Sequence, residues 1–133
     1  MPWAIFNRPS IQLSTLKGYL QQQGKGITVT ACHPYLETAK AITTETYRLL
    51  SEKCWAGEAL YSSLLFPEQR EGAKKVFLHV LGRKTARALP DFDRLASQLD
   101  TQLDDWLARL ALADFDLFGF SVCFSQLPAT LLA

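Results

Sequence analysis

Few side chains in this sequence could perform chemistry, and they are scattered. The three thiols, Cys32, Cys54 and Cys123, are far apart, and neither His33 nor His79 stands in a motif that pairs a base with a nucleophile. No two of them have the short spacing of a sequence-local zinc or iron–sulfur site. We therefore expect free thiols, no metal site and no self-contained active site. Cys123 stays open as a nucleophile, because catalytic pairs are defined by geometry and not by sequence distance.

The adjacent carboxylates Asp104 and Asp105 do not indicate acid–base catalysis. Neighbouring residues on a helix point about 100° apart, so these two side chains share no face. We interpret both as solvated surface charges.

Two polar segments are better candidates for ligand binding. The turn Cys123–Gln126 follows an apolar run, and the loop Met1–Ser10 precedes a predicted helix. Ligands of open α/β sheets bind beyond the carboxyl ends of the strands, and a helix N-terminus directs free N–H groups outward. Together with the donors of Arg8, the two segments predict a site for a large, flat or anionic ligand. The alternative, in which Ser10 is only a helix cap and Ser121 only a satisfied core hydroxyl, stays open.

Apolar residues repeat at intervals of three and four over several stretches, which is typical of helices packed on one face. The strongest pattern covers Phe92–Leu110. The other predicted helices run over about Ser10–Gln23, Thr44–Cys54, Gly57–Phe66 and Gly72–Leu89, with a further helix beginning at Pro128.

Two short runs predict β-strands. Ile27–Ala31 is rich in β-branched residues, and Leu117–Val122 is almost continuously apolar, as in a strand covered on both faces by helices. The order of elements predicts an α/β domain with a Rossmann-like (flavodoxin-like) fold and a large helical insert at roughly 35–110. A parallel sheet of two strands is seldom stable alone, so we expect this domain to be incomplete and part of a longer one.

Composition excludes several classes of protein. The 133 residues, 48% of them apolar, suit one domain, and the net charge of +1 argues against nucleic acid as the main partner. No stretch reaches the roughly 18 consecutive apolar residues of a membrane span. The N-terminus lacks the basic and apolar regions of a signal peptide. We therefore expect a cytoplasmic chain with no membrane contact.

Three segments, in the same order, carry a resemblance to a known family. Met-Pro-Trp-Ala at the start, with Arg8–Leu13 and Leu16–Leu20, resembles the first loop and helix of cobalamin-binding radical-SAM proteins. The closest group is the radical-SAM maturases of ribosomally made peptide natural products. Trp55–Phe66 is similar to a Gly-Glu-x-Leu-aromatic segment of that group, and Phe115–Gln126 resembles its strand and ligand loop.

The resemblance implies a Rossmann-like domain that holds cobalamin. In the family, a following barrel binds a [4Fe–4S] cluster and S-adenosylmethionine, and methyl transfer to a peptide carbon is a typical reaction. The positions that would line the corrin side are Pro2, Trp3, Arg8, Ser10, Ser121, Cys123 and Gln126. The Cys-x-x-x-Cys-x-x-Cys cluster motif is absent, so this chain alone is not expected to start radical chemistry. His33 lies in Cys-His-Pro and not in the Asp-x-His-x-x-Gly context of a cobalt ligand.

Three hypotheses about function follow. The first is a partial cobalamin-binding domain of a radical-SAM, peptide-modifying protein, not catalytic alone. The second is a helical interaction module in which Thr44–Leu110 packs on a partner chain, either a second copy or the rest of a radical-SAM protein. The third is a small thiol enzyme that uses Cys123.

Overall fold

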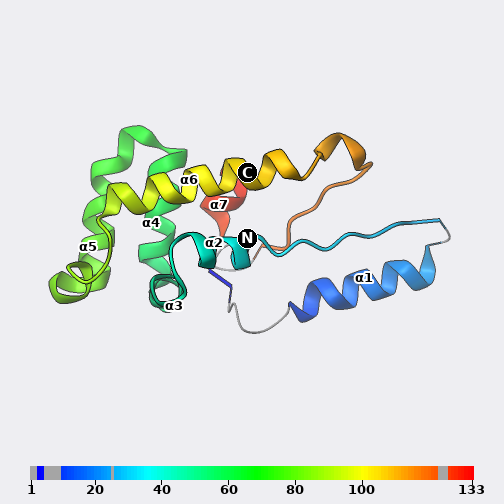
Figure 1. Ribbon diagram of the computed structural model, residues 1–133, viewed down its shortest axis with the longest axis horizontal. Helices are drawn as coiled ribbons and strands as arrows, with labels where there is room; N and C mark the ends of the chain where they lie inside the picture. Colours follow the sequence, from blue (N-terminus) through cyan, green and yellow to red (C-terminus); the bar gives the residue numbers. More distant parts are fainter. Residues whose placement is uncertain (1–2, 5–9, 25, 123–125) are drawn as a thin grey trace.

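The computed structural model describes residues 3–4, 10–24, 26–122 and 126–133, and every regular element in these ranges is helical (Figure 1). Seven α-helices and two short 3-10 helices (η) follow one another along the chain. They are α1 (Ile11–Gln23), α2 (Pro34–Ala41), α3 (Thr44–Glu52), α4 (Cys54–Leu65), η1 (Pro67–Gln69), α5 (Arg70–Ala86), α6 (Phe92–Arg109), η2 (Leu112–Asp114) and α7 (Leu127–Leu132).

The predicted α/β, Rossmann-like fold is wrong. Ile27–Ala31 and Leu117–Val122 form no strands, and no backbone hydrogen bond joins them within the part of the chain that the structure describes. A strand is stable only when a neighbouring strand pairs with its N–H and C=O groups. The apolar run was interpreted as covered on both faces, yet Leu117 is 89% exposed. The predicted helical insert at 35–110 is instead the main folded part of the molecule.

We call α2 to α6 together with α7 the helical body. Its centre is α4, which packs against α5, α6 and α7. Small residues on α4 permit these close contacts, since Ala56, Gly57 and Ala59 are all buried there. Leu60 and Tyr61 fill the space beside them. Close packing of this kind supplies most of the stability of a helical domain.

The strongest sequence prediction is confirmed by α6. The Asp91 carboxylate accepts a hydrogen bond from the Arg94 backbone N–H at 2.9 Å, which caps the first turn. One face is then buried along the helix, through Phe92, Leu95, Ala96, Leu99, Leu103 and Trp106. These positions repeat at three and four residues, so one stripe of α6 faces the body.

Polar contacts at both ends hold α6 against its neighbours. At its first turn, Asp93 accepts from Arg70 (3.0 Å) and Lys74 (2.6 Å) of α5. The hydrogen bond from Lys74 and the nearby charges lower the pKa of Asp93. At the other end, Arg109 forms an ion pair with Glu37 of α2. α5 itself is interrupted at Gly82, whose positive φ of 74° suits glycine.

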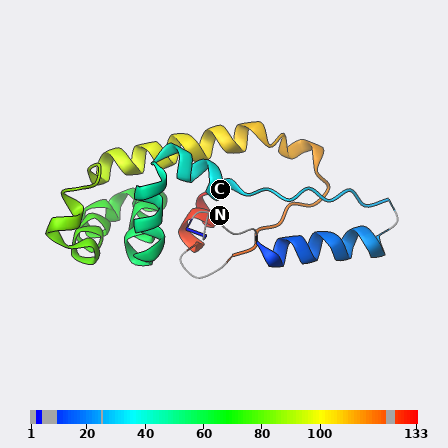
Figure 2. The same cartoon turned by 60° about the horizontal axis from the view of Figure 1, so that its bottom comes forward.

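The rest of the chain forms what we call the arm: α1, residues 26–31 and residues 111–122. Figures 1 and 2 show α1 and the segment 111–122 extending from the helical body on the same side. α1 begins as predicted, with the Ser10 hydroxyl accepting from the Leu13 N–H at 3.3 Å, but it buries no residue. Gly24 ends the helix in an extended conformation, with φ −96°. The arm therefore has local structure without a core of its own.

Candidate functional site

The cobalamin positions implied by the resemblance are divided between the two regions. Pro2, Arg8 and Cys123 lie outside the described residues. Trp3 and Gln126 are buried in the body, whereas Ser10 caps α1 and Ser121 is exposed on the arm. The four described positions are thus divided between the body and the arm end of the chain, and the corrin contact stays a prediction.

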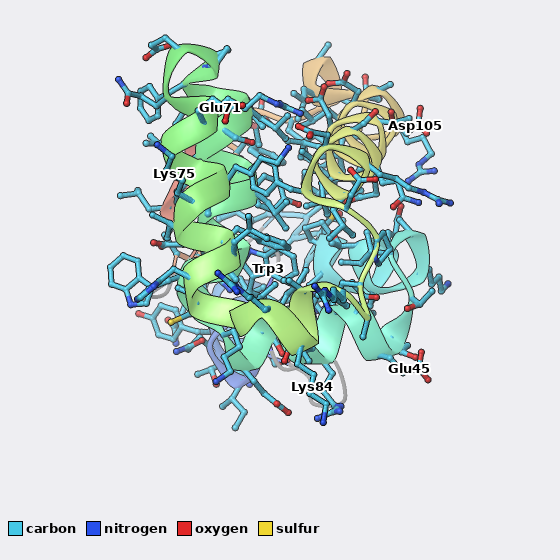
Figure 3. All side chains as sticks on the ribbon, turned by 90° about the vertical axis from the view of Figure 1, so that its left-hand side faces the viewer. Trp3, Glu45, Glu71, Lys75, Lys84 and Asp105 are labelled. Atoms are coloured by element: carbon cyan, nitrogen blue, oxygen red, sulfur yellow. The ribbon has the colours of Figure 1, made fainter. Side chains whose placement is uncertain are left out.

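Trp3 is a packing residue of the helical body. Its ring lies 5.5 Å from that of Tyr47 and 5.9 Å from that of Tyr61, and only 5% of the residue is exposed. Gly57 of α4 makes room for it, because a Cβ there would lie 2.6 Å from the indole. Figure 3 shows Trp3 in the interior, with Lys75 and Glu45 on the outside.

The segment Trp3–Ala4 is also held by a hydrogen bond. The Tyr47 hydroxyl donates to the carbonyl of Ala4 at 2.6 Å. Burial raises the pKa of both Tyr47 and Tyr61, so both phenols stay neutral. This start of the chain is therefore docked on α3 and α4, although Trp3 Nε1 is buried without a hydrogen-bond partner.

Gln126 has a structural role at the start of α7. Its carbonyl accepts from the Thr130 N–H at 3.1 Å and from the Thr130 hydroxyl at 2.8 Å. The residue is buried where α7 packs against α4. Gln126 follows the apolar run Leu117–Val122 in the sequence. The contacts observed for it are with α7, and the predicted corrin contact stays a prediction.

A polar groove lies between α2 and α6, with a volume of about 630 Å³. The hydroxyl of Thr38 donates to Gln102 Oε1 at 2.8 Å beneath it. Its walls are carboxylates, amides, hydroxyls and cations, among them Glu37, Lys40, Gln98, Gln102, Asp105 and Arg109. The groove includes no thiol or imidazole, and its charges are balanced, so its lining indicates no particular reaction or ligand charge.

The thiols and imidazoles within the described ranges are Cys32, Cys54, His33 and His79, and Cys123 lies outside these ranges. Cys32 and Cys54 are half-buried free thiols, as expected. His33 stacks edge-on against Tyr35 at 5.5 Å, and its Nδ1 is buried without a partner. No group of three or more potential metal ligands occurs within the described ranges. Among the helices described, none is long and apolar enough to cross a membrane.

The arm carries the most unusual surface of the molecule. Ten of its large apolar residues are exposed: Ile11, Leu16, Tyr19, Ile27, Leu112, Phe115, Leu117, Phe118, Phe120 and Val122. Monomeric soluble proteins rarely expose apolar patches larger than a few hundred Å² without a functional reason. The exposure of Leu117, Phe118, Phe120 and Val122 contradicts the prediction of a strand covered on both faces. The low charge of these segments is a signal of this apolar surface in the sequence itself. Lys17, Asp114 and Asp116 are the only ionic side chains in the described part of the arm.

Comparison with known proteins adds no relative: no family model, no curated protein and no solved structure matches this chain. The geometry of the arm is therefore the main structural basis for a functional proposal.

Proposed function

We propose that this chain is a non-catalytic, cofactor-binding module whose arm is covered by further polypeptide. The observation that carries the proposal is the exposed apolar arm, which has secondary structure but buries none of α1. Covering such a surface removes apolar area from water at about 25 cal/mol per Å², which is a strong driving force for association. We place the module in the cytoplasm, where Cys32 and Cys54 remain thiols.

The cofactor that we propose is cobalamin, bound once the arm is covered. Its support is the resemblance of three segments, in order, to cobalamin-binding radical-SAM peptide maturases. The described residues form no sheet edge, and the described corrin-side positions are divided between the body and the arm end of the chain. The covering polypeptide would have to complete the site around Ser10, which caps α1, and Ser121 of the arm. Iron–sulfur and S-adenosylmethionine chemistry would belong to the rest of a parent protein.

Hydroxocobalamin tests the cofactor directly. Purified protein is titrated with it while the visible corrin spectrum and co-elution on gel filtration are followed. We expect a spectral shift and retention that are lost in the double variant Ser10→Ala/Ser121→Ala. Ser97→Ala, on the exposed side of α6, is the matched control. Retention no greater than that of an unrelated helical protein would contradict cobalamin binding.

Amide hydrogen exchange tests the covering of the arm. The N–H groups of residues 28–31 and 116–122 make no backbone hydrogen bonds within the described chain, so they should exchange quickly in dilute protein. Covering them should slow their exchange, while the amides of α4 remain unchanged. Rapid exchange at every protein concentration, with and without hydroxocobalamin, would contradict the proposal.

A further inference from the structure

The apolar area of the arm is large enough to form a stable interface. A fully exposed large apolar side chain presents about 200 Å². Because the ten arm residues are between 37% and 89% exposed, together they present on the order of 1,000 Å². A specific protein–protein interface buries about 800 Å² on each partner. The arm alone therefore reaches the size that association requires, without help from the helical body.

A row of aromatic rings provides anchors within this area. The ring of Phe118 lies 6.3 Å from that of Phe115 and 5.0 Å from that of Phe120, both in edge-to-face arrangements. Leu117 lies within the row and is the most exposed apolar residue of the segment. Aromatic and large aliphatic residues at the centre of an interface carry most of its binding energy.

Two segments of the arm, α1 and residues 111–122, carry opposite charges. Lys17 is the only ionic residue of α1, and Asp114 and Asp116 are the only ones of residues 111–122. None of the three takes part in an ion pair within the described chain. The charge of α1 in one molecule would therefore complement the charge of residues 111–122 in an identical molecule.

We infer that the polypeptide covering the arm is a second copy of this chain. α1 of each copy packs against residues 111–122 of the other, and a two-fold axis produces both contacts at once. In this arrangement Lys17 of each copy faces Asp114 and Asp116 of its partner, and the phenylalanine row lies against the exposed Leu16 and Tyr19 of α1. The inference rests on the proposed function, since it names the partner that covers the arm.

Sedimentation equilibrium across the micromolar range tests the dimer. We expect a reversible monomer–dimer equilibrium, and Leu117→Asp should raise the dissociation constant at least about tenfold, because it places a charge in the apolar centre. Leu78→Asp, at an exposed position of α5, is the matched control and should leave the constant unchanged. Circular dichroism verifies that each variant keeps its helices.

A charge exchange tests the register. Lys17→Glu and Asp116→Lys should each weaken the dimer, and the double variant should restore it. A monomer at all concentrations, a dimer insensitive to Leu117→Asp, or a double variant as weak as the single ones would overturn the inference. Hydroxocobalamin retention that is lost in Ser10→Ala/Ser121→Ala, in a protein that stays monomeric, would support the proposed cofactor while this inference fails.

Discussion

Two helices that begin in the same way have opposite surroundings in this protein. α6 and α1 each begin at a capping side chain, Asp91 and Ser10, but the apolar stripe is pronounced on α6 and weak on α1. α6 buries six residues in the helical body, whereas α1 buries none. Periodicity therefore indicates which face of a helix can pack, and the neighbouring elements decide whether it does.

The same contrast separates the extended and the helical parts of the chain. Body helices satisfy their backbone hydrogen bonds internally, and their side chains share one core cluster. Residues 116–122 have neither backbone partners nor buried side chains within the described structure. The arm is thus the part that we propose another molecule covers, and unfolding of matched body and arm variants tests this difference.

The largest expected effect comes from a cavity in the body. Leu99→Ala removes a fully buried side chain of α6 and should lower the free energy of unfolding by about 3 kcal/mol. Leu16→Ala on α1, where the residue is 54% exposed, should change it by less than about 0.5 kcal/mol in dilute protein. Urea unfolding followed by circular dichroism measures both. Equal losses would show that α1 shares the core of the monomer.

Overpacking beside Trp3 should have the next largest effect. Gly57→Ala places a Cβ 2.6 Å from the indole ring, and the displacement should cost about 2 kcal/mol even though alanine favours helix. Gly18→Ala on α1 meets no atom within 4 Å and should leave global unfolding unchanged. Thermal unfolding of the two variants is the comparison. A Gly57→Ala protein as stable as the parent would contradict the docking of Trp3 on α4.

Alkaline pH should destabilise the body through its buried phenols. The folded-state pKa of Tyr61 is raised above its ordinary value of 10.0 by burial, so above about pH 10 the unfolded chain loses its proton first. The free energy of unfolding should then fall by about 1.4 kcal/mol per pH unit from this residue. Tyr61→Phe should flatten the decline, and Tyr19→Phe on the arm should not. A slope that is identical in both variants would contradict the prediction.

The smallest effect is expected at the exposed ion pairs between α5 and α6. Asp93, whose pKa is lowered chiefly by the hydrogen bond from Lys74, contributes stability that is present at neutral pH and lost as pH falls through its folded pKa. Asp93→Asn should therefore narrow the stability difference between neutral and acidic pH. Asp100→Asn, on an exposed turn of α6, is the control. An acid profile unchanged by Asp93→Asn would show that the pair contributes nothing measurable.

The sequence by itself determined most of the helices. The spacing of Phe92, Leu95 and Leu99 is a local signal, and α6 lies in the structure where that spacing predicts a helix. The predicted helices did not include α2, which begins at Pro34, shortly after the run Ile27–Ala31 that predicted a strand. Proline also suits the first turn of a helix, where its missing N–H group is not needed.

Only the tertiary structure decided the role of the remaining segments. Trp3 was predicted to face a corrin, but the space left by Gly57 buries it in the body, and spacing does not reveal a contact between residues so far apart in sequence. Leu117–Val122 has the composition of a buried strand, and it is extended but exposed. Strand pairing is non-local, because it depends on another segment that supplies hydrogen bonds and apolar cover, whereas helix hydrogen bonds close within the same segment.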